Sequence, residues 1–238
     1  MRVPIRRLSA ANPLWGAPRI IGELRKIGID VTKATIEKYM VRRRGPASPT
    51  WMTFLRTHAA EMISRDFFVV PTVKHQVLFV FLILMHHRRR VLHFHVTPNP
   101  SARWTAQQIV EAFPYVDPPR FLLRDRDHIH GPAFNQRVNA LGIEQIKAAP
   151  WSPWQNPYVE RLIGSIRREC LDHTIVLGER HLKRLLSDYF RYYHRWRTHQ
   201  ALEMDSPEGR DTHSIDRGRV AEVAEVGGLH HHYERIAV

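Results

Sequence analysis

The chain has 238 residues, and its 36 Lys and Arg against 23 Asp and Glu give a formal net charge of +13 at pH 7. This excess predicts a polyanionic partner, while 43% hydrophobic residues are enough for a core and exclude disorder over most of the chain. The single cysteine, Cys170, excludes an internal disulfide, and the longest apolar run, residues 77–85, is too short for a membrane span, so we expect a cytoplasmic protein without a membrane partner.

The N-terminal fifth of the chain is its most basic part. Residues 1–50 hold eleven Lys and Arg and three Asp and Glu, a net charge of +8. Apolar spacing predicts a helix over residues 18–27, and Thr32 is typical of the N-cap of a second helix that continues to about Arg43. Two helices joined by a tight turn predict a partial helix-turn-helix over residues 1–44, or else an ordinary helical hairpin with solvated charges. In the first case we expect DNA contacts from Arg42, Arg43 and Arg44.

The remaining sequence predicts a linker, a larger domain and a C-terminal tail. Gly45, Pro46 and Pro49 predict a linker over residues 45–53. Next come segments typical of strands (62–72, 77–85, 90–97, 120–124 and 143–146) and of helices (102–113, 134–141, from 157 to about 170, and around 182–189). This order predicts an α/β domain over residues 54–204 with a mixed five-stranded sheet flanked by helices. Residues 205–238 form a C-terminal tail.

Three acidic residues fit poorly with a purely structural role. Asp66 lies in an apolar strand, where an ionised carboxylate needs a cation, and Asp125 follows the strand that ends at residue 124. Glu160 lies in the first turn of the helix that Asn156 can cap, on the same face as Gly164 and Arg167.

Carboxylates that gather in one place can hold Mg²⁺ or Mn²⁺, and two such ions can clamp the attacking and leaving oxygens of a phosphoryl transfer. The alternatives are a turn role for Asp125, a helix-dipole role for Glu160, and pairing of Asp66 with Arg65 or with an arginine of residues 86–90. We expect the acidic centre to be neutralised by metal rather than by arginine.

Several motifs together resemble the catalytic core of integrase-type DDE transposases of bacterial insertion sequences, a superfamily shared with retroviral integrase. They are DFF at 66–68, RDRD at 124–127 and SPWQNPYVERLIGSIRREC at 152–170, with Asp125 and Glu160 separated by 35 positions. NPLWGAPRIIGEL at 12–24 and YHRWRTHQAL at 193–202 also resemble family motifs, so the resemblance covers about residues 12–207.

The resemblance implies a ribonuclease H-like fold in a bacterial, nucleoid-associated protein. Asp66, Asp125 and Glu160 would be both the catalytic residues and the metal ligands, with two Mg²⁺ or Mn²⁺ ions. The implied reaction is DNA strand cleavage by water followed by attack of a 3′-hydroxyl on target DNA. The implied partner is double-stranded DNA, bound by a homo-oligomer, and we expect DNA contacts from Asn156, Arg167 and Arg168.

Some residues depart from the family pattern. Asp127 offers a second aspartate beside Asp125, and we choose Asp125 because of its spacing to Glu160. The residues His128, Ile129 and His130 also differ from the family, and the N-terminal module is short. A truncated or decayed transposase that binds DNA without catalysis is therefore the alternative function. A nuclease acting on RNA–DNA hybrids is a third reading, disfavoured by the basic N-terminal module.

Overall fold

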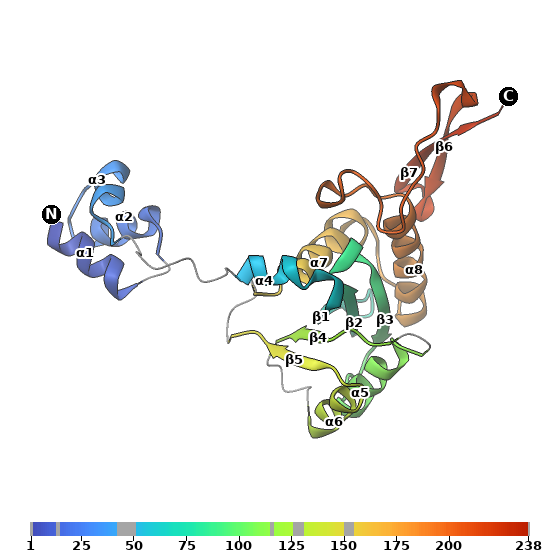
Figure 1. The fold of residues 1–238 in the computed structure, drawn as a ribbon, viewed down its shortest axis with the longest axis horizontal. Helices are drawn as coiled ribbons and strands as arrows, with labels where there is room; N and C mark the ends of the chain where they lie inside the picture. The colour runs from blue at the N-terminus through green and yellow to red at the C-terminus, as the bar shows by residue number, and fades with distance from the viewer. Residues whose placement is uncertain are drawn as a thin grey trace. The chain divides into compact units, whose positions relative to one another are not determined.

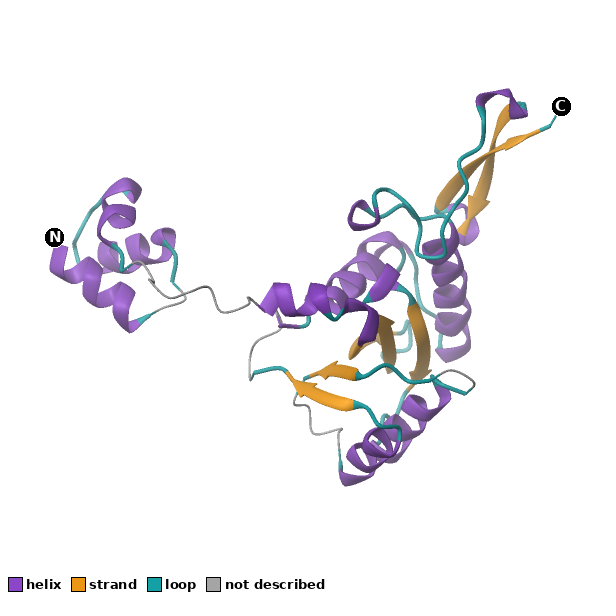
Figure 2. Cartoon of the chain, viewed as in Figure 1, coloured by secondary structure: helices purple, strands orange, loops and turns teal. Residues whose placement is uncertain are grey.

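The computed structural model describes residues 2–12, 15–41, 51–114, 117–125, 131–149 and 155–237. The chain divides into two compact units, Met1–Thr50 and Trp51–Val238 (Figures 1 and 2). Within the described ranges, no helix has both the length and the apolar character needed to cross a membrane.

The first unit contains three helices, α1 (Arg2–Ala11), α2 (Ala17–Lys26) and α3 (Lys33–Tyr39). They share a small apolar core whose fully buried members are Ile5, Ile20, Leu24 and Ile36. The Thr32 side chain accepts a hydrogen bond from the Thr35 backbone N–H, as expected for an N-cap.

Two details of this unit differ from the sequence-based expectation. Helix α1 was not predicted, and α3 ends at Tyr39 instead of near Arg43 because Met40 adopts an extended backbone conformation. The expected DNA contacts Arg42, Arg43 and Arg44 lie outside the described residues.

The second unit is built on a five-stranded mixed sheet with the order β3-β2-β1-β4-β5. Its strands are β1 (Met62–Pro71), β2 (Val77–Met85), β3 (Val91–Thr97), β4 (Phe121–Arg124) and β5 (Glu144–Lys147). Strands β1, β2 and β3 pair antiparallel, whereas β4 pairs parallel with β1 and with β5. The predicted mixed α/β sheet is thus confirmed, together with its ribonuclease H-like class.

Helices cover both faces of this sheet. They are α4 (Trp51–Thr57), α5 (Ala102–Glu111), α6 (Pro132–Ala140), α7 (Pro157–Glu169) and α8 (Glu179–Arg195). Short 3₁₀ turns are η1 (Ala59–Glu61), η2 (His87–Arg89), η4 (Leu171–His173), η5 (Gln200–Leu202), η6 (Ile215–Arg217) and η7 (Val226–Gly228).

The continuous apolar run of β2 reflects burial on both faces of the strand. Leu78, Val80 and Leu82 belong to the core under α7 and α8, whereas Phe81 and Ile83 belong to the core under α5 and α6. Successive side chains of a strand point to opposite faces, so a strand covered on both sides is apolar throughout.

The C-terminal tail contains an unpredicted hairpin of β6 (Arg219–Glu225) and β7 (His230–Ile236), drawn beside α8 in Figure 1. Two aromatic contacts hold it against the core. His232 stacks on Trp196 with ring centroids 3.6 Å apart, and His230 stacks on Tyr192 at 4.6 Å. His230 Nε2 also donates to the Glu169 carbonyl at 2.7 Å, which joins the hairpin to the end of α7.

Candidate active site

The strand alternation of β1 decides which way its central acid points. Ser64 and Phe68 lie on the α7 face of the sheet together with Asp66, whereas Arg65 faces α6, where its guanidinium lies 5.7 Å from the Phe134 ring centre. Asp125 directly follows β4, the parallel neighbour of β1, and Glu160 occupies the first turn of α7.

Asp66 is partly buried and carries the most perturbed carboxylate of the site. Burial raises its pKa to about 7, while the Phe67 backbone N–H, which donates to Asp66 Oδ1 at 2.7 Å, and the Arg65 charge lower it. The charges of Asp125 and Glu160 raise it further. A nearby cation would stabilise the ionised form of a carboxylate with this pKa.

Glu160 lies in the same electrostatic environment as Asp66. Its pKa is raised first by burial and then by the charge of Asp125. Asp125 therefore acts on the pKa of both Asp66 and Glu160, and Glu160 acts on that of Asp66, which requires that the fold bring the three within electrostatic range.

An arginine compensates part of this negative charge. Arg65 Nη2 donates to Asp125 Oδ1 at 3.0 Å, and the Arg65 side chain is only 1% exposed against 50% for Asp125. The expectation that metal rather than arginine neutralises the centre is therefore wrong for Asp125. The other pairing that we had considered, between Arg65 and Asp66, is reflected in the pKa of Asp66, which the Arg65 charge lowers.

A second buried arginine fixes the end of β4. Arg124 is 3% exposed, and its guanidinium donates to Gln145 Oε1 at 2.9 Å, to the Asp125 carbonyl at 3.0 Å and to Asn135 Oδ1 at 3.1 Å. These bonds tie the Asp125 backbone to β5 and α6. Sequence reasoning had assigned Arg124 no role, although a basic residue inside an apolar strand was a visible signal.

The three acids suit a divalent ion in kind, since carboxylate oxygens are the ligands that Mg²⁺ and Mn²⁺ prefer. Within the described residues, however, no three His, Cys, Asp or Glu side chains stand close enough together to hold an ion in their present rotamers. Asp127 lies outside the described residues. Asp66, Asp125 and Glu160 thus interact electrostatically but do not form a ready set of ligands in this structure.

The predicted DNA contacts on α7 occupy different environments. Asn156 is 5% exposed, its Nδ2 donates to the Arg65 carbonyl at 3.4 Å, and its side chain does not cap α7. Arg167 is exposed and its guanidinium lies 5.7 Å from the Phe68 ring centre. Arg168 is also exposed and folds back over Gly164, where an added Cβ would lie 3.1 Å from Arg168 Nη1. Gly164 therefore makes room for an arginine of its own helix.

Sequence reasoning missed a buried polar link between β1 and α7. His86 Nε2 lies 2.5 Å from Ser64 Oγ, and the His86 ring packs edge-on against Tyr158 at 4.6 Å. Burial and the Arg89 charge lower the His86 pKa to about 3, so this imidazole is neutral. Ser64 and Tyr158 each lie two residues before a triad acid, and His86 connects them. His86 belongs to the segment HHRRR at 86–90, from which its partners cannot be predicted.

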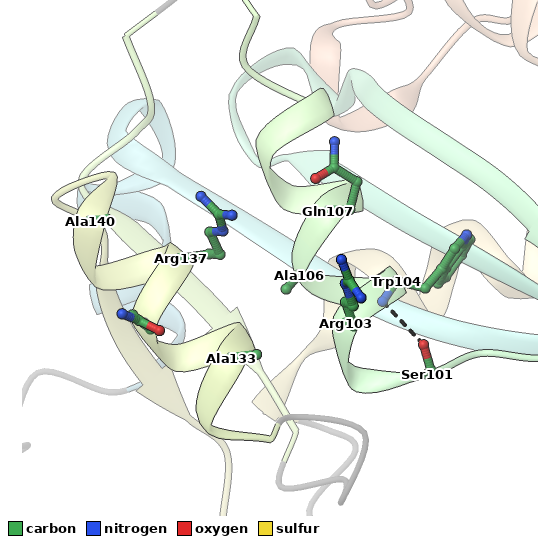
Figure 3. A pocket seen from close by; sticks show the side chains of 9 residues that line it. Ser101, Arg103, Trp104, Ala106, Gln107, Ala133, Arg137 and Ala140 are labelled. Atoms are coloured by element: carbon green, nitrogen blue, oxygen red, sulfur yellow. Dashed lines mark hydrogen bonds between the residues drawn. The ribbon is translucent and has the colours of Figure 1, made fainter.

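A separate cavity of about 870 Å³ lies between α5 and α6 (Figure 3). Arg103 and Gln107 from α5 and Arg137 from α6 line it, and Ser101 Oγ caps α5 by accepting from the Trp104 backbone N–H. None of its described lining residues is a carboxylate, and it lies among helices that cover the sheet face opposite α7. It is not part of the acidic centre.

Comparison with known proteins supports the interpretation of the second unit. Residues 141–207 match the family model of the integrase core domain. No curated protein matches the sequence.

Solved structures with the same fold come from transposases and integrases. The catalytic domain of Mos1 mariner transposase is 14% identical with a TM-score of 0.51, covering 59% of this chain and 75% of that one. Its structure with Raltegravir and Mg is 17% identical with a TM-score of 0.52, covering 59% and 76%. A simian T-cell lymphotropic virus intasome in complex with PP2A regulatory subunit B56 gamma is 11% identical with a TM-score of 0.54, covering 97% and 86%. At these identities the likeness establishes the fold.

Proposed function

We propose that the chain is a transposase of the DDE integrase and transposase superfamily and that it catalyses metal-dependent DNA cleavage and 3′-hydroxyl strand transfer. The observation that carries this proposal is the electrostatic coupling of three acids in the register of the family, in which Asp125 and Glu160 raise the pKa of Asp66. Neighbouring carboxylates destabilise a fold unless a cation compensates their charge, which supports a cation-binding role for these acids.

In this reaction the acidic residues and the buried arginines and histidine would have different roles. Asp66, Asp125 and Glu160 would hold Mg²⁺ or Mn²⁺, which supplies charge stabilisation and lowers the pKa of an attacking hydroxyl. Arg65 would hold the carboxylate of Asp125, and Arg124 would fix its backbone through the bond to the Asp125 carbonyl. His86 would keep the first turn of α7 in register with β1. Catalysis would then consist mainly of positioning and electrostatics, as in other phosphoryl transfers.

Double-stranded DNA is the substrate that we propose, because the net charge of +13 favours a polyanion and the basic first unit has the helical content of a DNA-binding module. Strand transfer joins two element ends to a target, so we also propose a homo-oligomer assembled on DNA. The measurement is the mass of the protein with and without end-sequence DNA.

Glu160→Gln is the sharpest test of catalysis, because it removes the charge and preserves the size of the side chain. We expect it to abolish Mg²⁺-dependent strand transfer on terminal-repeat DNA and to leave DNA affinity unchanged. Glu179→Gln is the matched control, since Glu179 is an exposed acid in the first turn of α8. Strand transfer that survives in Glu160→Gln would overturn the assignment.

A second candidate, a protein that binds DNA without catalysis, is favoured by two observations. Asp125 is already paired with Arg65, and the described residues hold no three ligands in position for an ion. The two candidates are separated by nicking of duplex DNA in Mn²⁺. Nicking by the wild type that disappears in Asp66→Asn excludes the second candidate, and no nicking under any metal excludes the first.

A further inference from the structure

A basic pocket lies beside α7. It borders the face of this helix that is formed by Tyr158, Arg161 and Ser165, and Glu160 lies on the adjacent face of the same helix. The volume of the pocket is about 370 Å³, and it is formed by η2, α7 and the segment that follows α8. We call it the arginine pocket after three of its lining residues, Arg89, Arg161 and Arg197, which are joined by Tyr158, Ser165 and His199. None of the described residues that line it carries a carboxylate.

Two of the three arginines keep their charge available for a ligand. Arg197 is neutralised by Glu169, to which Nε and Nη2 donate at 2.7 and 2.6 Å. Arg89 and Arg161, by contrast, make no ion pair with any acid in the described part of the chain, and Arg161 is exposed. Two guanidiniums of the pocket are therefore without an ion-pair partner among the described residues.

Arg89 is held in place by an unusual turn. Arg88 and Arg89 both have left-handed backbones, with φ of 54° and 56°, a conformation that is unfavourable for residues other than glycine. Arg88 compensates by binding Asp205 Oδ2 at 2.6 Å and the Pro207 carbonyl at 3.0 Å. Arg89 is thereby directed onto the Tyr158 ring, 3.6 Å from its centre. The turn thus stabilises an arginine at the pocket despite the backbone cost.

His199 adds a neutral donor. Burial and the Arg197 charge lower its pKa to about 4, and the Tyr193 backbone raises it by less, so the ring is neutral at pH 7. Its Nδ1 faces Arg197 Nη1 at 3.3 Å, and since a guanidinium only donates, Nδ1 is the acceptor and the proton is on Nε2. Nε2 is buried, and a backbone hydrogen bond with Tyr193 acts on the same ring, so His199 contributes a neutral ring to the pocket rather than a charge.

A pocket with two guanidiniums that make no ion pair with a described acid, and with no carboxylate among its described lining residues, suits a ligand that accepts hydrogen bonds. A phosphate group meets this requirement and matches the fork geometry of arginine. Arg161 directly follows Glu160, and Tyr158 precedes it by two residues, so the pocket and the acidic centre share one helical turn, about 5.4 Å in height. We propose that the arginine pocket binds a backbone phosphate of the DNA strand that runs past Glu160. The inference rests on the proposed function for the identity of the strand, not for the chemistry of the pocket.

The test is DNA affinity at several salt concentrations, measured with the full chain in EDTA, where no strand is cut. Each phosphate contact contributes about 0.9 to the slope of log affinity against log salt. Arg161→Gln should therefore reduce this slope by about one and weaken binding several-fold. Arg184→Gln on α8 is the matched control, because Arg184 is exposed, makes no ion pair with a described acid and does not line the pocket. It should leave the slope unchanged.

Three further measurements distinguish a bound phosphate from other ligands of the pocket and from a loss of catalysis. Inorganic phosphate should raise the melting temperature of the wild type and of Arg184→Gln but not of Arg161→Gln. Equal slopes for Arg161→Gln and Arg184→Gln would overturn the proposal. A change in the oligomer mass of Arg161→Gln with an unaltered slope would also overturn it, because the pocket would then bind a carboxylate of a second copy of the chain. Glu160→Gln should keep the wild-type slope, so a loss of catalysis and a loss of the phosphate contact are separable.

Discussion

Arg65 and Asp125 form an ion pair, 3.0 Å from Nη2 to Oδ1, in which the guanidinium is buried and the carboxylate is half exposed. The pair joins the centre of β1 to the end of β4. Arg65 and Asp66 are neighbours in sequence, and their side chains point to opposite faces of the sheet. The buried Arg65 nevertheless lowers the pKa of Asp66 and forms the ion pair with Asp125.

We predict that Asp125→Asn lowers the free energy of unfolding by about 1–3 kcal/mol, because it breaks an ion pair with a buried arginine. Urea titration at pH 7 without divalent metal is the measurement. Asp172→Asn is the control, since Asp172 is exposed and has no ion pair with a described residue. A stability equal to that of the control would mean that Asp125 contributes nothing to holding Arg65.

Asp66→Asn should have the opposite effect on stability. The pKa of Asp66 is raised to about 7 by burial, so the folded state binds this proton more tightly than the unfolded state does. Stability from this group is full below about pH 4 and is lost as pH rises to about 7. At pH 8 without metal, Asp66→Asn should therefore stabilise the protein by at least ~1.4 kcal/mol, the equivalent of one pKa unit. The difference from wild type should disappear near pH 4, and a pH-independent difference would contradict the prediction.

Binding of Mg²⁺ or Mn²⁺ should depend on pH through the same group. A metal ion and a proton compete for Asp66, so affinity should fall about tenfold per unit as pH drops below about 7. Calorimetry in two buffers of different ionisation enthalpy measures the proton released. Affinity that does not change between pH 6 and 8 would show that Asp66 is not a ligand.

Glu169→Gln should destabilise the protein by about 2–4 kcal/mol, because Glu169 accepts two hydrogen bonds from Arg197 and one from Tyr189 Oη at 2.8 Å. Hydrogen bonds from both partners lower the Glu169 pKa against the effect of burial. Its contribution is therefore present at neutral pH and lost as pH falls through the lowered pKa. Urea titrations should show a large difference from wild type at pH 7 and a smaller one at pH 3, whereas Glu179→Gln should match wild type at both.

Gly164→Ala should be tolerated and should raise stability by about 0.5–1 kcal/mol, the usual gain of alanine over glycine inside a helix. The added Cβ meets only the flexible tip of Arg168 at 3.1 Å. Thermal unfolding is the measurement. A marked loss of stability would show that the Arg168 side chain is fixed over Gly164.

The sequence by itself determined the five strands of the mixed sheet and the helices α5 to α8, but neither α4 nor the β6–β7 hairpin. Apolar runs such as residues 77–85 and the helical stripe from Val159 to Ile166 are properties of local spacing, which burial on one or two faces enforces. Motif spacing likewise selected Asp66, Asp125 and Glu160, whose electrostatic coupling the fold bears out and whose catalytic role stays a prediction.

Only the tertiary structure decided which residues meet across the sheet. The partners of Arg65, His86 and Arg89 lie on elements distant in sequence, and a single sequence contains no signal for such pairings. The β6–β7 hairpin was missed for the same reason, because its stability comes from stacking on Trp196 and Tyr192 rather than from an apolar pattern of its own. Local periodicity reports burial, whereas ion pairs and ring contacts depend on distances that exist only after the chain has folded.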